Sequence, residues 1–421
     1  MTSQPTHKSP HQSLRALWDA AVAAANPLHA LPPYLAAISD PRPKGRLVVV
    51  GAGKAAAAMA AAVRARFGAC EGALITRYDH LGQHARTRPD VQEAAHPVPD
   101  SAGAAATARM LGLVQGLGAD DVVLALISGG ASSLLCAPRS GMTLAQKAQI
   151  SADLLRKGAP IGDINLIRKQ FSAVKGGQLA AACAPAMVIG LIISDVAGDD
   201  LADIGSGPTV GDARDARAAA QRWGIDLPEG KSPVLHPNDP RLARVQNHLV
   251  AAPMASLRAS AKLAASYGWQ VEILGDDLVG EAQNLARAHG QLALDIAAHM
   301  TPANPPRLLL SGGEVTVTLA DAASGIGGPN AEYALALALA LQGHPRIYAL
   351  AADTDGIDGA GDAAGAWTGP RSVPNRANAL RDLQNHNAHG YFSRVGGAIV
   401  SGATQTNVND FRALLILPPN S

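Results

Sequence analysis

The sequence has few aromatic residues for its length. Phenylalanine, tryptophan and tyrosine make up 3% of its 421 residues, although hydrophobic residues make up 48%. The core must therefore consist mainly of alanine, valine, leucine and isoleucine, which is typical of parallel strands buried beneath small-residue helices. A chain of this length is expected to form two domains rather than one.

Cysteine is scarce, and neither sign of charge dominates. The three cysteines, Cys70, Cys136 and Cys183, are far apart and form no CxxC pair. This pattern excludes a disulfide framework or a zinc cluster and predicts buried free thiols. The net charge is +1, with acidic and basic residues interspersed, which predicts neither a nucleic acid nor a membrane surface as a partner.

Long hydrophobic runs are absent as well. No apolar stretch approaches the roughly 20 residues that span a bilayer. The first dozen residues are polar and lack the apolar segment of a signal peptide. We therefore expect a soluble, cytoplasmic protein.

Glycine is abundant, and glycine-rich loops follow several predicted strands. Most of these loops also carry Ser, Lys or Asp; they lie at residues 51–54, 128–133, 194–200, 311–314 and 353–356. Because the strand ends of an open parallel sheet face one crevice, where ligands bind, these loops predict a site for highly charged substrates.

Strand and helix patterns alternate along most of the chain, which predicts a parallel α/β layer structure. The proline-rich stretch TPANPP at residues 301–306 cannot continue a helix and is interpreted as a linker. We predict a Rossmann-like parallel-sheet domain over residues 14–300 and a smaller α/β domain over residues 307–417.

The motif GAGKAA at residues 51–56 matches the dinucleotide fingerprint between a strand and a helix. Its glycines would let the backbone approach a phosphate at the helix N-terminus. Lys54 would add a positive charge there, where the helix dipole disfavours one. A tight turn with an exposed lysine is the structural alternative.

The motif SGGASS at residues 128–133 resembles a second anion-binding loop. It lacks the closing glycine of a nucleophile elbow, so serine hydrolysis is disfavoured. A serine cap on a packed helix is the alternative.

A predicted helix over residues 163–178 places Asn165 and Arg168 on one polar face, although such a face is often only solvated. Lys175 precedes two glycines, which could release the helix so that the lysine turns inward.

Two groups of aspartates follow predicted strands, and magnesium needs only one or two carboxylates beside substrate phosphates. Asp195, Asp355 and Asp358 are the predicted ligands, while most other members suit caps and turns.

Taken in order, the motifs resemble the glycerate 2-kinase family with a C-terminal MOFRL domain, whose members are also often labelled hydroxypyruvate reductase. The matching segments are GAGK (51–54), HPVPD (96–100), SGGASS (128–133), KGG (175–177), SDV (194–196), GSGPT (205–209), TDGIDG (354–359) and TNVND (406–410). The resemblance covers nearly the whole chain. It implies ATP-dependent phosphorylation of D-glycerate at the C2 hydroxyl to 2-phospho-D-glycerate and ADP, with Mg2+, in a cleft between the two domains.

The residue patterns and the resemblance together yield a set of candidate site residues. The catalytic candidates are Lys54, Lys175 and Asp195. The nucleotide-binding candidates are Gly51, Gly53, Ser128, Gly129, Gly130, Ser132, Ser133, Glu314 and Asn330. Asn165 and Arg168 would bind D-glycerate, and Asp195, Asp355 and Asp358 would bind the metal ion. The oligomeric state stays open, with a homodimer among the options.

One position departs from the family. Many relatives have an arginine where this chain has Pro329, so a group that could clamp a phosphate or carboxylate is missing. Arg168 and Arg371 are the candidates to compensate for it.

The main alternative is an NAD(P)H-dependent hydroxypyruvate reductase that uses residues 51–56, with Arg77 facing the 2′-phosphate of the cofactor. The additional anion loops and the aspartate groups argue against it, because hydride transfer does not need them. A non-enzymatic regulator finds no support in a DNA-binding motif or a basic stripe.

Overall fold

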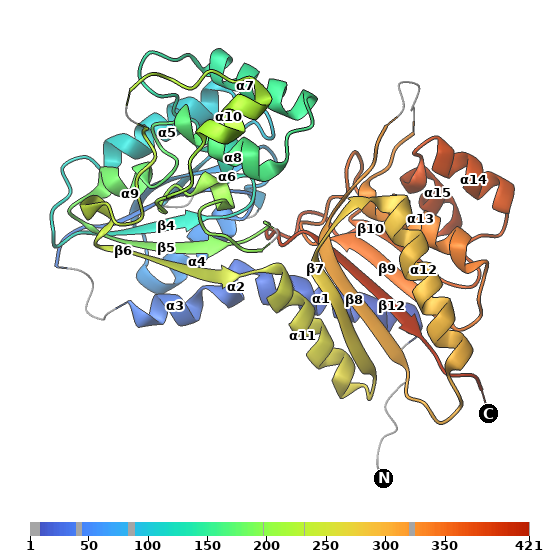
Figure 1. The fold of residues 1–421 in the computed structure, drawn as a ribbon. Coiled ribbons are helices and arrows are strands. Elements are labelled where there is room, and N and C mark those ends of the chain that lie inside the picture. The colour runs from blue at the N-terminus through green and yellow to red at the C-terminus, as the bar shows by residue number, and fades with distance from the viewer. Residues whose placement is uncertain are drawn as a thin grey trace, which may run out of the picture. The chain divides into compact units, whose positions relative to one another are not determined.

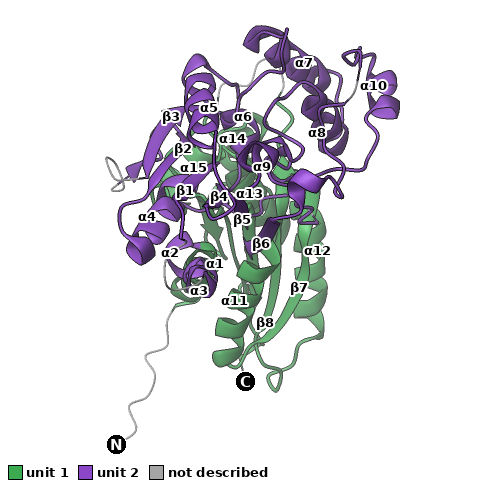
Figure 2. Cartoon of the chain, turned by 90° about the vertical axis from the view of Figure 1, so that its left-hand side faces the viewer, with its two compact units in different colours: residues 1–25, 253–404, 408–421 green, residues 26–252, 405–407 purple. Residues whose placement is uncertain are grey.

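The computed structural model describes residues 9–38, 44–82, 89–196, 198–230, 232–319 and 325–420. The chain forms two compact units, distinguished by colour in Figure 2. Unit 1 comprises residues 1–25, 253–404 and 408–421, and unit 2 comprises residues 26–252 and 405–407. Each unit combines helices with a six-stranded sheet (Figure 1), so the predicted α/β class is confirmed.

The sheet of unit 2 is parallel throughout, with strand order β3-β2-β1-β4-β5-β6. This is the order of doubly wound Rossmann sheets, in which ligands bind beyond the carboxyl ends of the strands where the order reverses, between β1 and β4. The strands are β1 (Leu47–Ala52), β2 (Glu71–Arg77), β3 (Asp90–Ala94), β4 (Val122–Ile127), β5 (Met187–Ile193) and β6 (Val245–Ala251).

Small aliphatic side chains build the core of unit 2. β1 and β4 are continuous apolar runs with five buried residues each, as a sheet covered on both faces requires. The helices are α2 (Pro27–Ala30), α3 (Pro32–Ala37), α4 (Ala56–Phe67), α5 (Ser101–Leu113), α6 (Ala131–Leu134), α7 (Leu144–Arg156), α8 (Ile161–Gln170), α9 (Gln178–Cys183) and α10 (Arg217–Trp223).

The sheet of unit 1 is mixed, with strand order β11-β10-β9-β12-β8-β7. Only the β7–β8 pair is parallel. The strands are β7 (Gln270–Glu281), β8 (Arg307–Thr316), β9 (Ile347–Asp353), β10 (Gly365–Thr368), β11 (Ala398–Ile399) and β12 (Asp410–Ile416). The helices are α1 (Pro10–Ala25), α11 (Pro253–Ser266), α12 (Ala282–His299), α13 (Pro329–Leu341), α14 (Arg376–Gln384) and α15 (Ala388–Val395).

The division of the chain differs from the predicted one. The proline-rich stretch at 301–306 connects α12 to β8 inside unit 1, where β7 pairs directly with β8. The chain instead passes between the units at residues 25–26 and 252–253, and residues 405–407 return to unit 2. The pairing of β7 with β8 and the return of residues 405–407 set this division, and local sequence does not reveal either.

The predicted loop at 311–314 is part of a strand. β8 continues to Thr316, and a Cβ atom at Gly313 (φ 103°) would overlap backbone atoms of Leu278 in β7. The register between β7 and β8 shifts on both sides of Gly275. The glycine therefore serves the close packing of an irregular strand pair rather than a strand-end loop.

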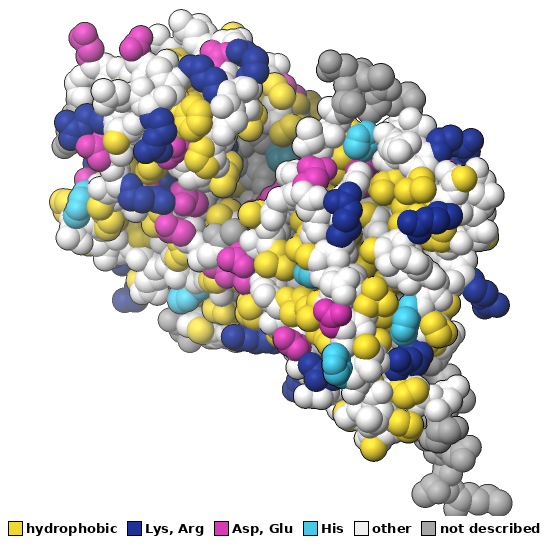
Figure 3. Space-filling model, turned by 45° about the vertical axis from the view of Figure 1, so that its right-hand side comes forward, with side chains coloured by type: hydrophobic (Ala, Val, Ile, Leu, Met, Phe, Trp, Pro, Cys, Tyr) yellow, Lys and Arg dark blue, Asp and Glu magenta, His cyan; other side chains and the backbone are white. Residues whose placement is uncertain are grey.

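Charged side chains of both signs are interspersed on the face shown in Figure 3. Within the described ranges, no helix combines the length and the apolar character needed to cross a membrane.

Candidate active site

The turns that follow β1 and β4 are joined by hydrogen bonds. The Ser128 hydroxyl accepts from the amide of Ala55 at 3.1 Å, and the amide of Lys54 donates to the carbonyl of Gly129 at 2.8 Å. Gly130 adopts a left-handed conformation (φ 81°) just before α6, which glycine tolerates without steric cost. The two turns therefore form one rigid loop pair at the switch point of the sheet.

The glycines at the end of β1 and just after it are required by this close contact. A Cβ atom at Gly51 would overlap the carbonyl of Leu126, and one at Gly53 would overlap the Ser128 hydroxyl. The amides of residues 53–56 all donate to acceptors within the protein. The amides that a phosphate would use at this turn are thus engaged, and nucleotide binding by Gly51 and Gly53 stays a prediction.

Asp195 follows β5 and lies against the second turn. A Cβ atom at Gly129 would overlap its Oδ2 atom, to which Asn407 donates from Nδ2 at 3.1 Å. Burial raises the pKa of Asp195, while the charges of Lys54 and Arg168 and the Asn407 hydrogen bond lower it. The carboxylate therefore lies in a partly desolvated place under the influence of two cations.

Arg168, Ser132 and Asn165 all contact the hydroxyl group of Ser206. Ser206 accepts from Arg168 Nε at 2.7 Å, lies 2.7 Å from the Ser132 hydroxyl and donates to Asn165 Oδ1 at 3.3 Å. Burial lowers the pKa of Arg168 to about 10, so its guanidinium stays charged at neutral pH. The predicted substrate residues Asn165 and Arg168 thus lie beside the predicted anion loop.

Lys175 supports this loop from buried surroundings. Its ammonium donates to the carbonyls of Ser132 at 2.7 Å and Leu135 at 3.2 Å, and burial lowers its pKa well below the ordinary value. α8 ends at Gln170, so the helix is shorter than the predicted one, and Gly176 and Gly177 (φ 57° and 84°) turn the chain after Lys175. Through these contacts Lys175 holds α6, and a catalytic role for Lys175 stays a prediction.

Three residues that contact the candidate side chains of unit 2 had no predicted role: His96, Ser206 and Asn407. A Cβ atom at Gly130 would lie 3.0 Å from the ring of His96 and 3.6 Å from Lys54 Cγ, while Ser206 and Asn407 bond to Arg168 and Asp195. All three belong to segments that carried the family resemblance. The polar character of these residues within those segments is the sequence feature that could have identified them.

In unit 1, Asp358 and Asn330 form hydrogen bonds at the start of α13. Asp358 is 1% exposed and accepts from the amides of Asn330 at 2.9 Å and Ala331 at 2.8 Å, at the start of α13. His389 Nε2 lies 3.1 Å from the same carboxylate, and Asn330 also donates to Asp410 at 2.6 Å. The interpretation of Asp358 as a metal ligand and of Asn330 as a nucleotide ligand is therefore not supported by these contacts.

The other candidates of unit 1 are dispersed. Asp355 is buried and accepts from the amide of Ile357 at 2.9 Å, as in an Asx turn. The side chain of Glu314 is exposed on β8. Arg371 lines a cavity with Tyr348, near the first residue of β9, whereas the turn that holds Asp358 follows the last residue of that strand. Arg371 is therefore not placed to replace the family arginine at Pro329.

The predicted metal ligands, Asp195, Asp355 and Asp358, fit magnesium only in part. Within the described part of the chain, no three His, Cys, Asp or Glu side chains gather as a metal site. Magnesium needs one or two carboxylates beside phosphate oxygens, and Asp195 is the one candidate carboxylate in unit 2. Asp358 does not meet that need, because protein donors occupy both its oxygens.

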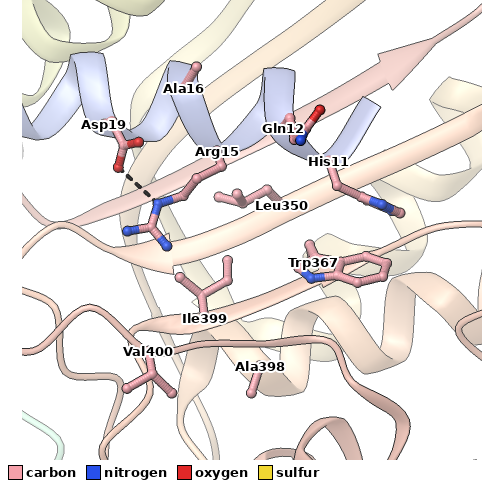
Figure 4. Close-up of a pocket in the computed structure, with 10 residues that line it drawn as sticks. All are labelled: His11, Gln12, Arg15, Ala16, Asp19, Leu350, Trp367, Ala398, Ile399 and Val400. Carbon is pink, nitrogen blue, oxygen red and sulfur yellow. Dashed lines mark hydrogen bonds and ion pairs between the residues drawn. The ribbon is translucent and has the colours of Figure 1, made fainter. Parts of the chain in front are cut away.

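A separate cavity of about 880 Å³ lies in unit 1 between α1 and the strands β9 to β11. Figure 4 shows His11 beside the Trp367 ring, and Arg15 bonded to Asp19 at 2.8 Å. The ring centroids of His11 and Trp367 are 3.5 Å apart. None of the predicted site residues lines this cavity.

Comparison with known proteins covers both halves of the chain. Residues 13–235 match the domain of unknown function DUF4147, and residues 307–410 match the MOFRL family. An Agrobacterium vitis protein named "Putative hydroxypyruvate reductase" is 46% identical over 97% of this chain and 95% of its own length. The D-glycerate 2-kinase of Thermotoga maritima is 34% identical over 90% and 94%. The crystal structure of a Thermotoga maritima glycerate kinase matches with a TM-score of 0.84 at 32% identity, covering 96% of this chain and 98% of that one.

Proposed function

The chain belongs to the glycerate 2-kinase family, with a DUF4147 and a MOFRL domain, and from this premise we propose that it transfers the γ-phosphoryl group of ATP to the C2 hydroxyl of D-glycerate. The products are 2-phospho-D-glycerate and ADP. Phosphoryl transfer depends chiefly on positioning and on neutralising charge, and the polar cluster of unit 2 suits both requirements.

The position of Asp195 carries this proposal. Its carboxylate lies against Gly129 and is under the influence of Lys54 and Arg168. Because burial raises its pKa, the carboxylate is suited to accept the proton of the substrate hydroxyl. Lys54 would neutralise charge on the transferred phosphoryl group.

The remaining residues would position the substrates. Ser132, Ser133 and the amides of Gly129 and Gly130 would contact nucleotide phosphates, while Arg168 and Asn165 would orient D-glycerate. Magnesium, when bound, would neutralise phosphate charge; Asp195 is the candidate carboxylate to hold it, as the alternative to its role as the base. Asp355 stays a predicted metal ligand.

Hydroxypyruvate reduction is the second candidate, because relatives carry that name. A dinucleotide would need free amides after β1, yet residues 53–56 donate to the protein itself. This observation favours the kinase.

A pair of assays separates the two reactions. A coupled assay detects ADP release with D-glycerate. In parallel, the oxidation of NADH and NADPH is measured with hydroxypyruvate. We expect ADP release that depends on D-glycerate, and its loss in Asp195→Asn. Asp215→Asn, at an exposed ion pair with Arg217, should retain activity. Oxidation of NADH or NADPH without ADP release would instead establish the reductase.

A further inference from the structure

Lys147 is buried without a hydrogen-bond acceptor. Its side chain is 6% exposed, and its Nζ atom has no partner among the described residues. It lies in the first turn of α7, where the helix dipole disfavours a cation. Burying an unpaired ammonium is costly, so a lysine here calls for a compensating role.

The local fold brings Lys147 to the same end of a helical hairpin as Arg168. Thr143 and Gln146 form a capping box that fixes the start of α7. α7 and α8 are joined by four residues and pack in one apolar cluster, which includes Leu154 and Ile167. In such a hairpin the start of the first helix and the end of the second lie together.

Three basic side chains gather around this end of the hairpin. Lys147, Arg168 and Lys175 interact electrostatically with one another. Arg168 uses Nε for Ser206, and Lys175 bonds to backbone carbonyls. Of the acids that act on Arg168, Asp203 is paired with Arg214 at 2.8 Å and Asp195 also faces Lys54. An anionic ligand would balance the group.

We propose that Lys147 is a substrate-specificity residue that, with Arg168, binds the carboxylate of the 2-hydroxy acid substrate. This inference rests on the proposed function for the class of substrate. A planar guanidinium matches a carboxylate in a bidentate manner, and the buried ammonium supplies the second charge. The pair would let the enzyme select glycerate over glycerol, which differs from it by lacking the carboxylate.

Lys147→Met removes the charge and keeps most of the side-chain volume. Loss of a charged hydrogen bond should raise KM and Kd for D-glycerate about 10- to 100-fold. KM for ATP should stay within about twofold and kcat should change little. The melting temperature of the ligand-free protein should stay equal or rise, because an unpaired buried charge is removed. Lys147→Arg should restore part of the affinity.

Lys157→Met is the matched control, since Lys157 is exposed just after α7 and bonds to the carbonyl of Trp223. It should leave affinity for D-glycerate unchanged. If Lys147→Met does not fold, Lys147→Gln takes its place. An unchanged Kd for D-glycerate, or a loss of affinity confined to ATP, would overturn the proposal.

Calorimetric binding distinguishes this inference from the proposed reaction. D-glycerate and hydroxypyruvate both carry the carboxylate, so both should bind the wild type and bind the Lys147 variant weakly. Glycerol should bind neither. If the wild type binds these acids without releasing ADP, the kinase proposal fails while the carboxylate site stands. If the variant binds both acids as the wild type does, the site is refuted whichever reaction is found.

Discussion

At the scale of single residues, Ser206 combines backbone strain with a central hydrogen-bonding role. Its φ of 62° lies in the left-handed region, between Gly205 and Gly207 with φ of 58° and 60°. Such a conformation costs an L-residue about 1–2 kcal/mol. The strain is retained where the hydroxyl joins Arg168, Ser132 and Asn165.

Two substitutions separate the strain from the hydrogen bonds. Ser206→Ala and Ser206→Gly both remove the acceptor of Arg168, so both should lose most activity. Ser206→Gly also relieves the strain, so its free energy of unfolding should exceed that of Ser206→Ala by about 1 kcal/mol. Urea denaturation measures this difference as a higher midpoint concentration. Equal stabilities, or wild-type activity in either variant, would contradict this account.

Asn407 tunes the carboxylate of Asp195. Burial raises the pKa of Asp195 above the ordinary value of 3.8, and the Asn407 hydrogen bond is among the influences that lower it. A base works only when deprotonated, so activity should fall as pH drops through the pKa of Asp195. Asn407→Ala should move this acid limb to higher pH, measured as kcat/KM against pH. An acid limb at the same pH, or a shift to lower pH, would rule out this coupling.

At the scale of elements, Asp195 and Asn407 leave no room for a side chain at Gly129, in the turn after β4. A Cβ atom there would overlap Asp195 Oδ2 and lie 2.6 Å from Asn407 Nδ2. Gly129→Ala should therefore displace the Asp195 carboxylate and reduce kcat/KM by a factor of about 100, the scale of losing one transition-state contact.

A glycine within a helix provides the control substitution for Gly129→Ala. Gly112 lies in α5, and nothing is within 4 Å of a Cβ atom added to it. Gly112→Ala should leave kcat/KM unchanged and stabilise the protein by about 0.5–1 kcal/mol, since alanine favours a helix. If Gly129→Ala also kept full kcat/KM, the close packing around Asp195 would have no part in activity.

At the scale of the whole molecule, the predicted site residues fall in both units, with Lys54 and Asp195 in unit 2 and Asp355 in unit 1. If one active site uses both sets, ligands should close the protein and exclude water that competes for the γ-phosphate. Small-angle scattering should then show a smaller radius of gyration when magnesium, a non-hydrolysable ATP analogue and D-glycerate are added together. Each ligand alone serves as the control. An unchanged radius with all three demonstrably bound would count against a shared site.

The sequence by itself determined the α/β class and much of the candidate site. Strands β1, β4 and β5 were predictable because apolar runs followed by glycine turns are local signals, although β1 continues through Gly51 and Ala52 of the predicted first loop. Parallel strands bring their carboxyl ends to one edge of the sheet. Lys54, Ser132 and Asp195 therefore belong to one cluster, as their loop positions predicted.

Only the tertiary structure decided which distant segments meet. Asn407 reaches Asp195 across 212 positions of sequence, β7 joins the sheet of unit 1 rather than unit 2, and Asp358 stabilises the start of α13. An aspartate after a strand looks the same in sequence whether it faces a substrate or a helix end. Burial and long-range pairing separate the two roles, and both arise only when the strands and helices pack.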